Sequence, residues 1–307
     1  MGIESKYIWM DGRLVEYEKA TVPFLNSGLH YGLGVFEGIR CYSTERGSAI
    51  FRANEHFERL INSARILGFC NLPYTAAELV EAAKETIRAN DFPACYIRPL
   101  IYHTTANPTL NMDNGEARVG IAVWDWGAYL GEEAIEKGVR ANISSFTRHA
   151  PNIMMTKAKI TGNYSNSVLA KTESVRLGFD EAIMLDPQGY VAECTGENLF
   201  IVRKGAIYTP QAADVLEGIT RDSLLALAGD LGYTVKEILI SRDQLYIADE
   251  VFVCGTAAEV VAVTEIDFRT IGSGRMGPVT RRLQQAFNAV VHGKHPRSEA
   301  WLTYVNS

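Results

Sequence analysis

The chain of 307 residues carries a formal net charge of −6, which excludes the strongly basic surface typical of nucleic-acid-binding proteins. Its composition, 47% hydrophobic and 21% charged, is that of a globular protein, and no apolar run approaches the ~20 residues of a membrane span. The five cysteines are scattered without a C-x-x-C pair and the N-terminus lacks a signal-peptide pattern, so we expect a cytoplasmic protein with no nucleic-acid or membrane partner, no disulfide and no metal site.

The N-terminal elements begin with a hairpin. Asp11-Gly12 lies between two apolar runs and is a strong signal for a two-residue hairpin turn. The stretch 25–42 that follows is rich in glycine and aromatic residues and places Glu37 and Arg40 among apolar neighbours. Glycines let the backbone approach another segment or a ligand closely, so either a tight turn beside a strand or a ligand-binding segment fits this pattern.

Two helices are predicted next. Apolar residues at helical spacing predict a helix from about Asn54, and Arg59 within it is by default a solvated side chain. A second helix opens at Thr75, where Glu78 three residues later completes a capping box, and it ends near Asn90.

The segment 94–102 alternates in the manner of a strand. Within it, Arg98 lies between apolar neighbours and therefore needs an anion or another acceptor. A long polar loop is expected over 103–116 and a further strand over 119–126. The two glycines within 127–133 mark the best candidate for a domain boundary.

The stretch that follows has one candidate for each chemical need of a single cofactor. Lys159 has apolar neighbours, which favour the neutral, nucleophilic form of an amine. Such a lysine forms an imine with a carbonyl, including the aldehyde of pyridoxal phosphate (PLP). Tyr164 offers a phenol for the ring oxygen of that cofactor, and Glu193 a carboxylate for its pyridinium nitrogen. Taken alone this pattern is weak, because most lysines are solvated.

The second half contains two candidate anion sites and a third glycine-rich segment that only resembles one. Residues 216–222 precede an apolar helix, with Gly218 and with Thr220 as the expected N-cap; such helix starts can bind phosphate, although most bind nothing. The strand within 249–259 ends in a Gly-Thr-Ala turn, whose backbone amides are a second candidate. The motif G-S-G-R-M-G at 272–277 matches a dinucleotide fingerprint, but too few residues follow it for a βαβ unit, so a glycine turn before a helix is favoured.

Taken together, the motifs resemble those of one enzyme family. They are H-Y-G-L-G-V-F-E-G-I-R-C-Y, Y-I-R-P-L, W-G-A-Y-L-G, A-K-I-T-G-N-Y, E-C-T-G-E-N-L-F, L-E-G-I-T-R-D, D-E-V-F-V-C-G-T-A-A-E and G-P-V-T-R-R-L-Q-Q-A-F. They cover essentially the whole chain, and the set is specific although no single motif is. The chain resembles the branched-chain amino acid aminotransferases of the fold-type IV, PLP-dependent family.

This resemblance implies an α+β fold of the D-amino acid aminotransferase type, with two domains and PLP at the domain interface. We expect a small N-terminal α/β domain over 1–128, an interdomain loop over 129–135 and a larger C-terminal PLP-binding domain over 136–307. The resemblance also implies transamination of L-leucine, L-isoleucine and L-valine with 2-oxoglutarate by a ping-pong mechanism. The expected assembly is a homodimer at the least, with a hexamer as the larger alternative.

The resemblance further implies roles for matching residues. Lys159 corresponds to the Schiff-base lysine, Tyr164 to the partner of the ring hydroxyl and Glu193 to the partner of the pyridinium nitrogen. The G-N-Y that follows distinguishes Lys159 from Lys157, and Glu197 is the alternative to Glu193. The cofactor-binding positions are these three residues together with Arg59, Leu216, Gly218, Ile219, Thr220, Gly255 and Thr256.

The implied substrate-binding positions are spread along the chain. They are Tyr31, Phe36, Gly38, Arg40, Tyr96, Arg98, Trp126, Tyr129, Thr256 and Ala257. Tyr31 and the loop around 103–110 are expected to reach the partner subunit's site. Loop 103–113 departs from the bacterial pattern, which leaves the substrate range open. A D-amino acid or (R)-amine transaminase and an aminodeoxychorismate lyase-like enzyme are the alternatives, with a non-catalytic binding protein more distant.

Overall fold

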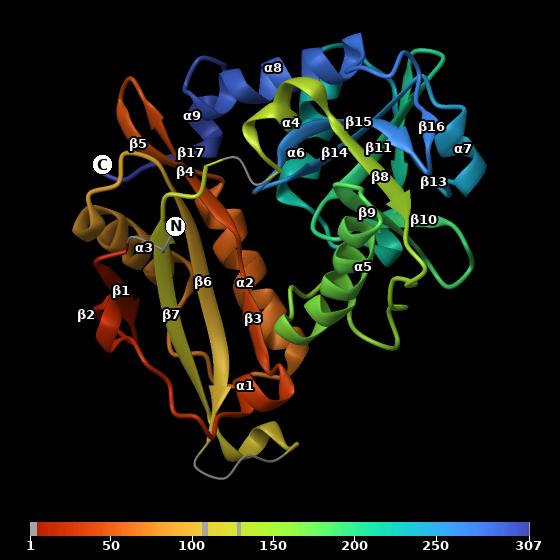
Figure 1. The fold of residues 1–307 in the computed structure, drawn as a ribbon. Helices are drawn as coiled ribbons and strands as arrows, with labels where there is room; N and C mark the ends of the chain where they lie inside the picture. Colours follow the sequence, from red (N-terminus) through yellow and green to blue (C-terminus); the bar gives the residue numbers. More distant parts are fainter. Residues whose placement is uncertain (1–4, 106–109, 128–129, 307) are drawn as a thin grey trace. The chain divides into compact units, whose positions relative to one another are not determined.

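A computed structural model describes residues 5–105, 110–127 and 130–306, so the predicted site residue Tyr129 lies outside the described residues. The chain divides into two compact units, each a sheet with helices, as the predicted α+β fold requires (Figure 1). Unit 1 comprises Met1–Trp126, Ala158–Asn163 and Val290–Ser307, and unit 2 comprises Gly127–Lys157 and Tyr164–Ala289.

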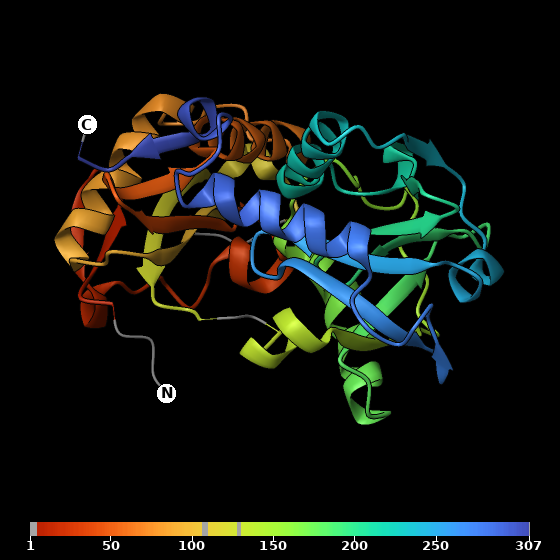
Figure 2. The same cartoon turned by 90° about the horizontal axis from the view of Figure 1, so that it is seen from above.

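Unit 1 contains an eight-stranded sheet. Its strands are β1 (Tyr7–Met10), β2 (Arg13–Glu16), β3 (Gly34–Phe36), β4 (Ile39–Thr44), β5 (Gly47–Phe51), β6 (Cys95–Thr104), β7 (Glu116–Trp124) and β17 (Leu302–Tyr304). The order along the sheet is β17-β5-β4-β6-β7-β1-β2, and β3 pairs with β6. Figure 2 shows β17, the C-terminal strand, beside β5, with which it pairs in antiparallel fashion.

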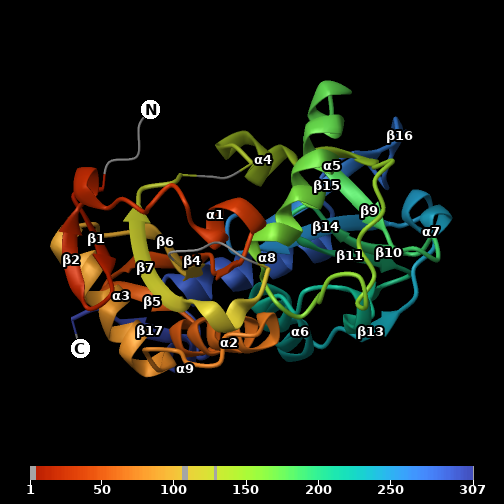
Figure 3. The same cartoon turned by 90° about the horizontal axis from the view of Figure 1, so that it is seen from below.

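Unit 1 also contains helices, and the two longest, α2 (Ala53–Leu67) and α3 (Ala76–Asn90), bury its core against this sheet. The other helices are η1 (Tyr17–Lys19), α1 (Ser27–Tyr31), η2 (Met112–Asn114), η3 (Thr161–Asn163) and α9 (Ser298–Trp301). Helices α2 and α3 cover one face of the sheet (Figure 3). Phe57 and Leu60 of α2 and Leu79 of α3 are fully buried in one apolar cluster with Ile97 of β6 and Ile121 of β7.

Two local signals in unit 1 are confirmed. Asp11 and Gly12 form the turn between β1 and β2 with φ values of 47° and 92°, as a type I′ hairpin turn requires. At the start of α3, the Thr75 hydroxyl accepts from the Glu78 amide at 3.3 Å, while the Glu78 carboxylate accepts from the Thr75 amide at 2.8 Å. The predicted capping box is therefore present, and α3 ends at Asn90 as expected.

Unit 2 contains a nine-stranded mixed sheet. Its strands are β8 (Val139–Ile143), β9 (Glu181–Leu185), β10 (Val191–Cys194), β11 (Asn198–Arg203), β12 (Ala206–Pro210), β13 (Val235–Ile238), β14 (Glu250–Gly255), β15 (Glu259–Ile266) and β16 (Arg269–Thr270). The order is β10-β9-β8-β15-β14-β11-β12-β13, and β16 pairs with β15. The helices are α4 (Glu132–Lys137), α5 (Tyr164–Arg176), η4 (Ala212–Asp214), α6 (Ile219–Asp230), α7 (Arg242–Tyr246) and α8 (Pro278–Val291), whose last two residues belong to unit 1.

The G-S-G-R-M-G motif is a glycine turn before α8, as favoured from the sequence. Gly272 and Gly274 have φ values of 53° and 71°, which glycine adopts readily. The Glu250 carboxylate accepts from the amides of Val279 and Thr280 at 3.0 and 2.8 Å and so caps the first turn of α8. The start of this helix is therefore closed by a protein side chain.

The structure corrects two predicted loops. Strand β6 runs on to Thr104 because it remains paired with β7 as far as Glu116, so the expected loop over 103–116 is shorter. Helix α4 begins at Glu132, inside the stretch 129–135 that was expected to be a loop. Glutamate and alanine in this stretch, followed by Lys137, favour helix, and this local propensity prevails over the flanking glycines.

The predicted N-cap of α6 is also wrong. The helix begins at Ile219 with Gly218 as its N-cap, and Thr220 lies inside the first turn, buried. The domain bounds stay a prediction, although residues 158–163 and 290–307, which the sequence assigned to the C-terminal domain, have their contacts in unit 1.

Among the described residues, none of the helices combines the length and the apolar character that crossing a membrane requires. Within the same part of the chain, no group of three or more histidine, cysteine, aspartate or glutamate side chains is arranged to hold a metal ion.

Candidate active site

Lys159 is held in unit 1 by backbone contacts to two distant elements. Its carbonyl accepts from the Phe36 amide at 3.0 Å, and its amide donates to the Ser63 hydroxyl of α2 at 3.0 Å. The next residue, Ile160, forms an isolated bridge with Val35 of β3. These contacts fix the backbone on both sides of the side chain, whose Nζ lies 5.1 Å from the centroid of the Phe36 ring. The amine is thus presented on a rigid segment.

Arg98 approaches the same aromatic ring. Its Cζ lies 4.9 Å from the centroid of Phe36, 5.3 Å from that of Tyr96 and 5.7 Å from that of Trp124. The Arg98 Nε is buried and has no hydrogen-bond partner among the described residues. A buried guanidinium N–H without a partner is costly, so this group is suited to an anionic ligand. The prediction that Arg98 needs an anion or acceptor thus has a geometric basis.

Aromatic side chains surround this guanidinium. The rings of Tyr96 and Trp126 meet edge to face, with centroids 4.5 Å apart. A Cβ added at Gly38 would lie 1.9 Å from the Tyr96 hydroxyl, so only glycine lets that hydroxyl take its place. Arg40 is the strand partner of Tyr96. Unit 1 therefore brings together six predicted substrate positions: Phe36, Gly38, Arg40, Tyr96, Arg98 and Trp126.

Tyr31 does not belong to this cluster of described contacts. It is the last residue of α1 and is 45% exposed, with His30 as its ring neighbour. Its predicted role concerns a second subunit and is taken up below.

Arg59 is partly buried, where the default expectation was a solvated side chain. Its Nε and Nη2 donate to the two carboxylate oxygens of Glu37 at 2.6 and 2.8 Å. The same carboxylate contacts Nδ1 of His56 at 2.8 Å. Burial alone would raise the pKa of Glu37, but the Arg59 charge and the His56 hydrogen bond outweigh it and hold this pKa well below its usual range.

In unit 2, Glu193 is buried and held on several sides. The sheet register shifts between Val191 and Glu193, a β-bulge of the kind that re-aims a side chain. One carboxylate oxygen accepts from Nε and Nη2 of Arg148 at 2.8 and 2.7 Å. The other accepts from the Asn198 amide group at 3.3 Å and from the Leu216 backbone amide at 3.2 Å. This arrangement stabilises a charged carboxylate in a buried position.

Asn198 connects Glu193 to the start of α6. Its side-chain amide also donates to the Leu216 carbonyl at 3.1 Å, and a Cβ added at Gly218 would lie 1.9 Å from its side-chain oxygen. Gly218 makes no side-chain cap, so the backbone N–H groups of Ile219 and Thr220 begin the helix without one. Such an N-terminus suits a phosphate.

The turn after β14 belongs to the same region of unit 2. Asn198 is paired with Cys254 across β11 and β14, which places Gly255, Thr256 and Ala257 directly after that pair. A Cβ added at Gly255 would lie 3.2 Å from the Gly196 carbonyl. Asn198 thus contacts Glu193 and Leu216, lies against Gly218 and is the strand partner of the residue before Gly255.

The remaining predicted catalytic residue, Tyr164, is the first residue of α5. Lys157, the alternative to Lys159, donates from Nζ to the Val215 carbonyl at 3.1 Å and lies 3.5 Å from a Glu217 oxygen. The alternative lysine is thus bound to unit 2 partners.

Comparisons with known proteins show the family to which the chain belongs. The family model for amino-transferase class IV matches residues 34–266, most of the chain. The chain belongs to this family. It is 48% identical to the branched-chain-amino-acid aminotransferase of Pseudomonas aeruginosa over 97% of each chain, and 45% identical to that of Escherichia coli over 99% of this chain and 98% of the other.

Solved structures give the same result. The T.th. branched-chain amino acid aminotransferase with pyridoxamine 5′-phosphate has a TM-score of 0.96 and 51% identity, over 99% of this chain and 100% of that one. A structure of the Escherichia coli enzyme has a TM-score of 0.96 and 45% identity over the same shares. The predicted resemblance to fold-type IV aminotransferases is confirmed.

Several contact residues of this class IV aminotransferase were not assigned a role from the sequence. Asn198 belongs to the recognised motif E-C-T-G-E-N-L-F, which was a usable signal. Glu37 stands out only as a carboxylate among apolar neighbours. Ser63, His56 and Arg148 have no local signal, because each acts through a partner at least 19 positions away in the chain.

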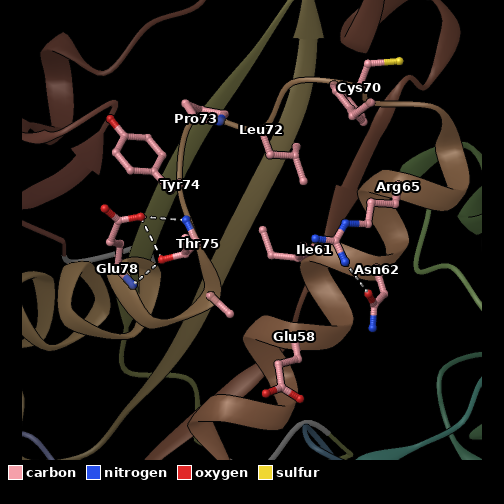
Figure 4. Close-up of a pocket in the computed structure, with 12 residues that line it drawn as sticks. Glu58, Ile61, Asn62, Arg65, Cys70, Leu72, Pro73, Tyr74, Thr75 and Glu78 are labelled. Carbon is pink, nitrogen blue, oxygen red and sulfur yellow. Dashed lines mark hydrogen bonds between the residues drawn. The ribbon is translucent and has the colours of Figure 1, made fainter.

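A separate pocket of about 610 Å³ lies on unit 1 between the end of α2 and the start of α3 (Figure 4). Apolar side chains such as Ile61 and Leu72 line it together with the exposed Glu58 and Arg65. None of the predicted site residues lines this pocket, so it is distinct from the aminotransferase residues described above.

Proposed function

We propose that this protein transfers the amino group of L-leucine, L-isoleucine or L-valine to 2-oxoglutarate with pyridoxal phosphate as cofactor. The products are the branched-chain 2-oxo acids and L-glutamate, formed by a ping-pong mechanism. The observation that carries the proposal is that the amine of Lys159 and the guanidinium of Arg98 lie against one ring, that of Phe36. The relatives named branched-chain aminotransferases, matched over nearly the whole chain, support the substrate class.

The residues present fit the cofactor. The buried carboxylate of Glu193 is kept charged by Arg148, as a partner of a protonated ring nitrogen must be. The uncapped start of α6 offers backbone N–H groups to a phosphate, and Arg59 offers a guanidinium. When bound, pyridoxal phosphate supplies an aldehyde carbon that takes up the amino group and a ring that accepts electrons.

We propose the following roles for the chain's own residues. Lys159 would bond the aldehyde carbon of the cofactor and, as a free amine, would move a proton at the substrate Cα and the cofactor C4′. Tyr164 donates a hydrogen bond to the ring oxygen. Glu193 holds the proton on the ring nitrogen. The phosphate is bound by Arg59, Ile219, Thr220 and Thr256, supported by Leu216, Gly218 and Gly255.

The substrate pocket combines apolar surface with polar ends. Phe36, Tyr96 and Trp126 supply aromatic surface for an aliphatic side chain. Arg98 supplies the partner for a carboxylate of either substrate. The proposal also includes Gly38, Arg40, Thr256 and Ala257, as well as Tyr129 outside the described residues. One pocket can then accept both leucine and glutamate.

We further propose a homodimer as the smallest active assembly, located in the cytoplasm, with the two domains 1–128 and 136–307 in each subunit. The segment before and within α1 exposes apolar side chains that a second copy would cover: Phe24 is 77% exposed, Leu29 61% and Tyr31 45%. Tyr31 and the loop around 103–110 would then serve the partner's site. Light scattering of the purified protein checks this, and a monomeric mass would contradict it.

Specificity constants for several amino donors test the function. With 2-oxoglutarate as acceptor, L-leucine, L-isoleucine and L-valine should be preferred and should differ modestly, about tenfold, because each methylene is worth roughly 1–3 kcal/mol. D-alanine and (R)-1-phenylethylamine serve as competitors with the same chemistry. If either is used more efficiently than L-leucine, the branched-chain assignment fails while the cofactor chemistry stands.

A further inference from the structure

We propose that Glu37 is a positioning residue for phosphate binding: it holds the guanidinium of Arg59 in one orientation, with His56 as the second anchor of its carboxylate. This inference rests on the proposed function, in which Arg59 binds the cofactor phosphate. None of the three side chains needs to react, so the claim concerns affinity for the phosphate and not the amino transfer itself.

The pairing of Glu37 with Arg59 is bidentate. Nε of Arg59 donates to one carboxylate oxygen at 2.6 Å and Nη2 to the other at 2.8 Å. Two parallel bonds between planar groups fix the plane of the guanidinium as well as its position. The Glu37 side chain is fully buried, whereas the Arg59 side chain is 15% exposed.

His56 keeps the carboxylate itself in place. Its Nδ1 lies 2.8 Å from a Glu37 oxygen, and the amide of Gly38 donates to that oxygen at 3.3 Å. Burial lowers the pKa of His56, although the Glu37 hydrogen bond and charge oppose this, so the ring is neutral at pH 7 and donates from Nδ1–H. Because the histidine is neutral, it does not compete with Arg59 as a positively charged partner of the Glu37 carboxylate.

The pair is also tied to the reactive lysine. His56, Arg59 and Ser63 recur at intervals of three and four residues and so lie along one stripe of α2. Ser63 accepts from the Lys159 amide, and Phe36, which precedes Glu37, donates to the Lys159 carbonyl. One helix stripe and one strand end thus fix both Lys159 and Arg59, which sets the phosphate-binding group relative to the amine.

Two opposite effects of Glu37 can be separated by experiment. As an anchor it should strengthen phosphate binding, because the guanidinium is already oriented. As a negative charge it should weaken phosphate binding, because it partly neutralises Arg59. The bidentate geometry and complete burial lead us to expect that orientation prevails.

The test measures the affinity of the apoprotein for PLP and for pyridoxal, which lacks the phosphate, by absorbance titration. Glu37→Gln should weaken PLP binding about tenfold or more, the usual effect of losing a hydrogen bond to a charged group, and leave pyridoxal binding unchanged. In an Arg59→Ala background, Glu37→Gln should have no further effect on PLP. Glu58 is an exposed carboxylate of α2, next to Arg59 in the chain, so Glu58→Gln is the matched control and should match the wild type.

The outcomes distinguish this inference from the proposed function. If Arg59→Ala leaves PLP affinity unchanged, the phosphate role of Arg59 in the proposed function is wrong. Suppose instead that Arg59→Ala weakens PLP binding. Glu37 then does not position Arg59 if Glu37→Gln leaves PLP binding unchanged or tightens it, or if it weakens the binding of PLP and pyridoxal equally. Should Glu37→Gln fail to fold, His56→Gln tests the same prediction. It should lower the affinity for PLP but not for pyridoxal, and this effect should disappear in the Arg59→Ala background. An equal loss of affinity for pyridoxal would contradict the inference.

Discussion

At the scale of single residues, two lysines two positions apart differ in what they contact. Lys159 lies beside Phe36, whereas Lys157 is bound to Val215 and Glu217. We expect Lys159→Ala to lower the rate of amino transfer by orders of magnitude, because the amine that carries the proton is gone. Lys157→Ala is the control and should keep most of the activity. Single-turnover rates with L-leucine measure both, and far-UV circular dichroism confirms that both fold.

Glu193 and Glu197 are distinguished by their partners in the same way. Glu193 is paired with Arg148 and Asn198, while Glu197 accepts from the Gly196 amide. Glu193→Gln should slow the proton-transfer step at least tenfold with cofactor still bound, because an amide holds a proton on the ring nitrogen less well. Glu197→Gln should affect that step much less. Equal or reversed effects in stopped-flow absorbance would show that the wrong glutamate has been assigned.

The chemical groups of the site were predictable from the sequence, whereas the residues that hold them were not. Lys159, Tyr164 and Glu193 stand in recognisable motifs. Arg148 stands in no such motif, and it pairs with a carboxylate 45 positions away. A contact of this kind depends on the folded sheet and leaves no periodic or local pattern in the chain.

At the scale of elements, the start of α6 depends on a glycine that packs against Asn198. Gly218→Ala should displace that side chain, because the added Cβ would lie 1.9 Å from its oxygen. We expect a loss of about 1–3 kcal/mol in the free energy of unfolding and weaker PLP binding. Gly229→Ala, within the same helix, has no atom within 4 Å of the added Cβ and should stabilise by up to about 1 kcal/mol. Chemical denaturation and PLP titration measure both variants, and a neutral Gly218→Ala would contradict the packing argument.

Helix starts show why local signals succeed in one place and fail in another. At Thr75 the cap is made by side chains three residues apart, so the sequence contains all of it. At α6 the sequence offered Thr220, but the N-cap is Gly218, which lies against Asn198 of another strand. Tertiary packing determines where this helix begins, and rules based on neighbouring residues in the sequence do not take such packing into account.

At the scale of the whole molecule, acid should destabilise the folded state. Burial and the nearby Arg148 lower the pKa of His149 from 6.5 to about 4. Because the folded-state pKa lies below the unfolded one, this contribution is complete above pH 6.5 and is lost as the pH falls from 6.5 towards 4. The lowered pKa of buried His56 destabilises the folded state in the same way below pH 6.5. The lowered pKa of Glu37 does so below pH 4.5, the ordinary pKa of a glutamate.

The free energy of unfolding, measured by denaturant at several pH values, checks this. His149→Gln should remove about 1–2 kcal/mol of the decrease between pH 7 and 4, less than the full linkage value because the side chain is partly exposed. A His149→Gln curve parallel to that of the wild type would contradict the argument.

The division of the chain into units was predictable only in outline. The first boundary between the units lies next to residue 127, at the start of the glycine-containing stretch 127–133. Residues 158–163 also belong to unit 1, and neither composition nor periodicity indicates this. Their place in unit 1 depends on the β-bridge between Ile160 and Val35, which lie 125 positions apart in the chain. Such pairings are set by the whole fold, and it is this one that presents Lys159.

Reductive trapping tests the central claim most directly. The protein is incubated with PLP and treated with borohydride, which converts the bond between the lysine and the cofactor into a stable amine. Peptide mapping by mass spectrometry then locates the label. The account predicts a single labelled site, Lys159, and its loss when excess L-leucine converts the bound cofactor to its amine form before reduction. Label on Lys157, or a protein that takes up no PLP, would contradict it.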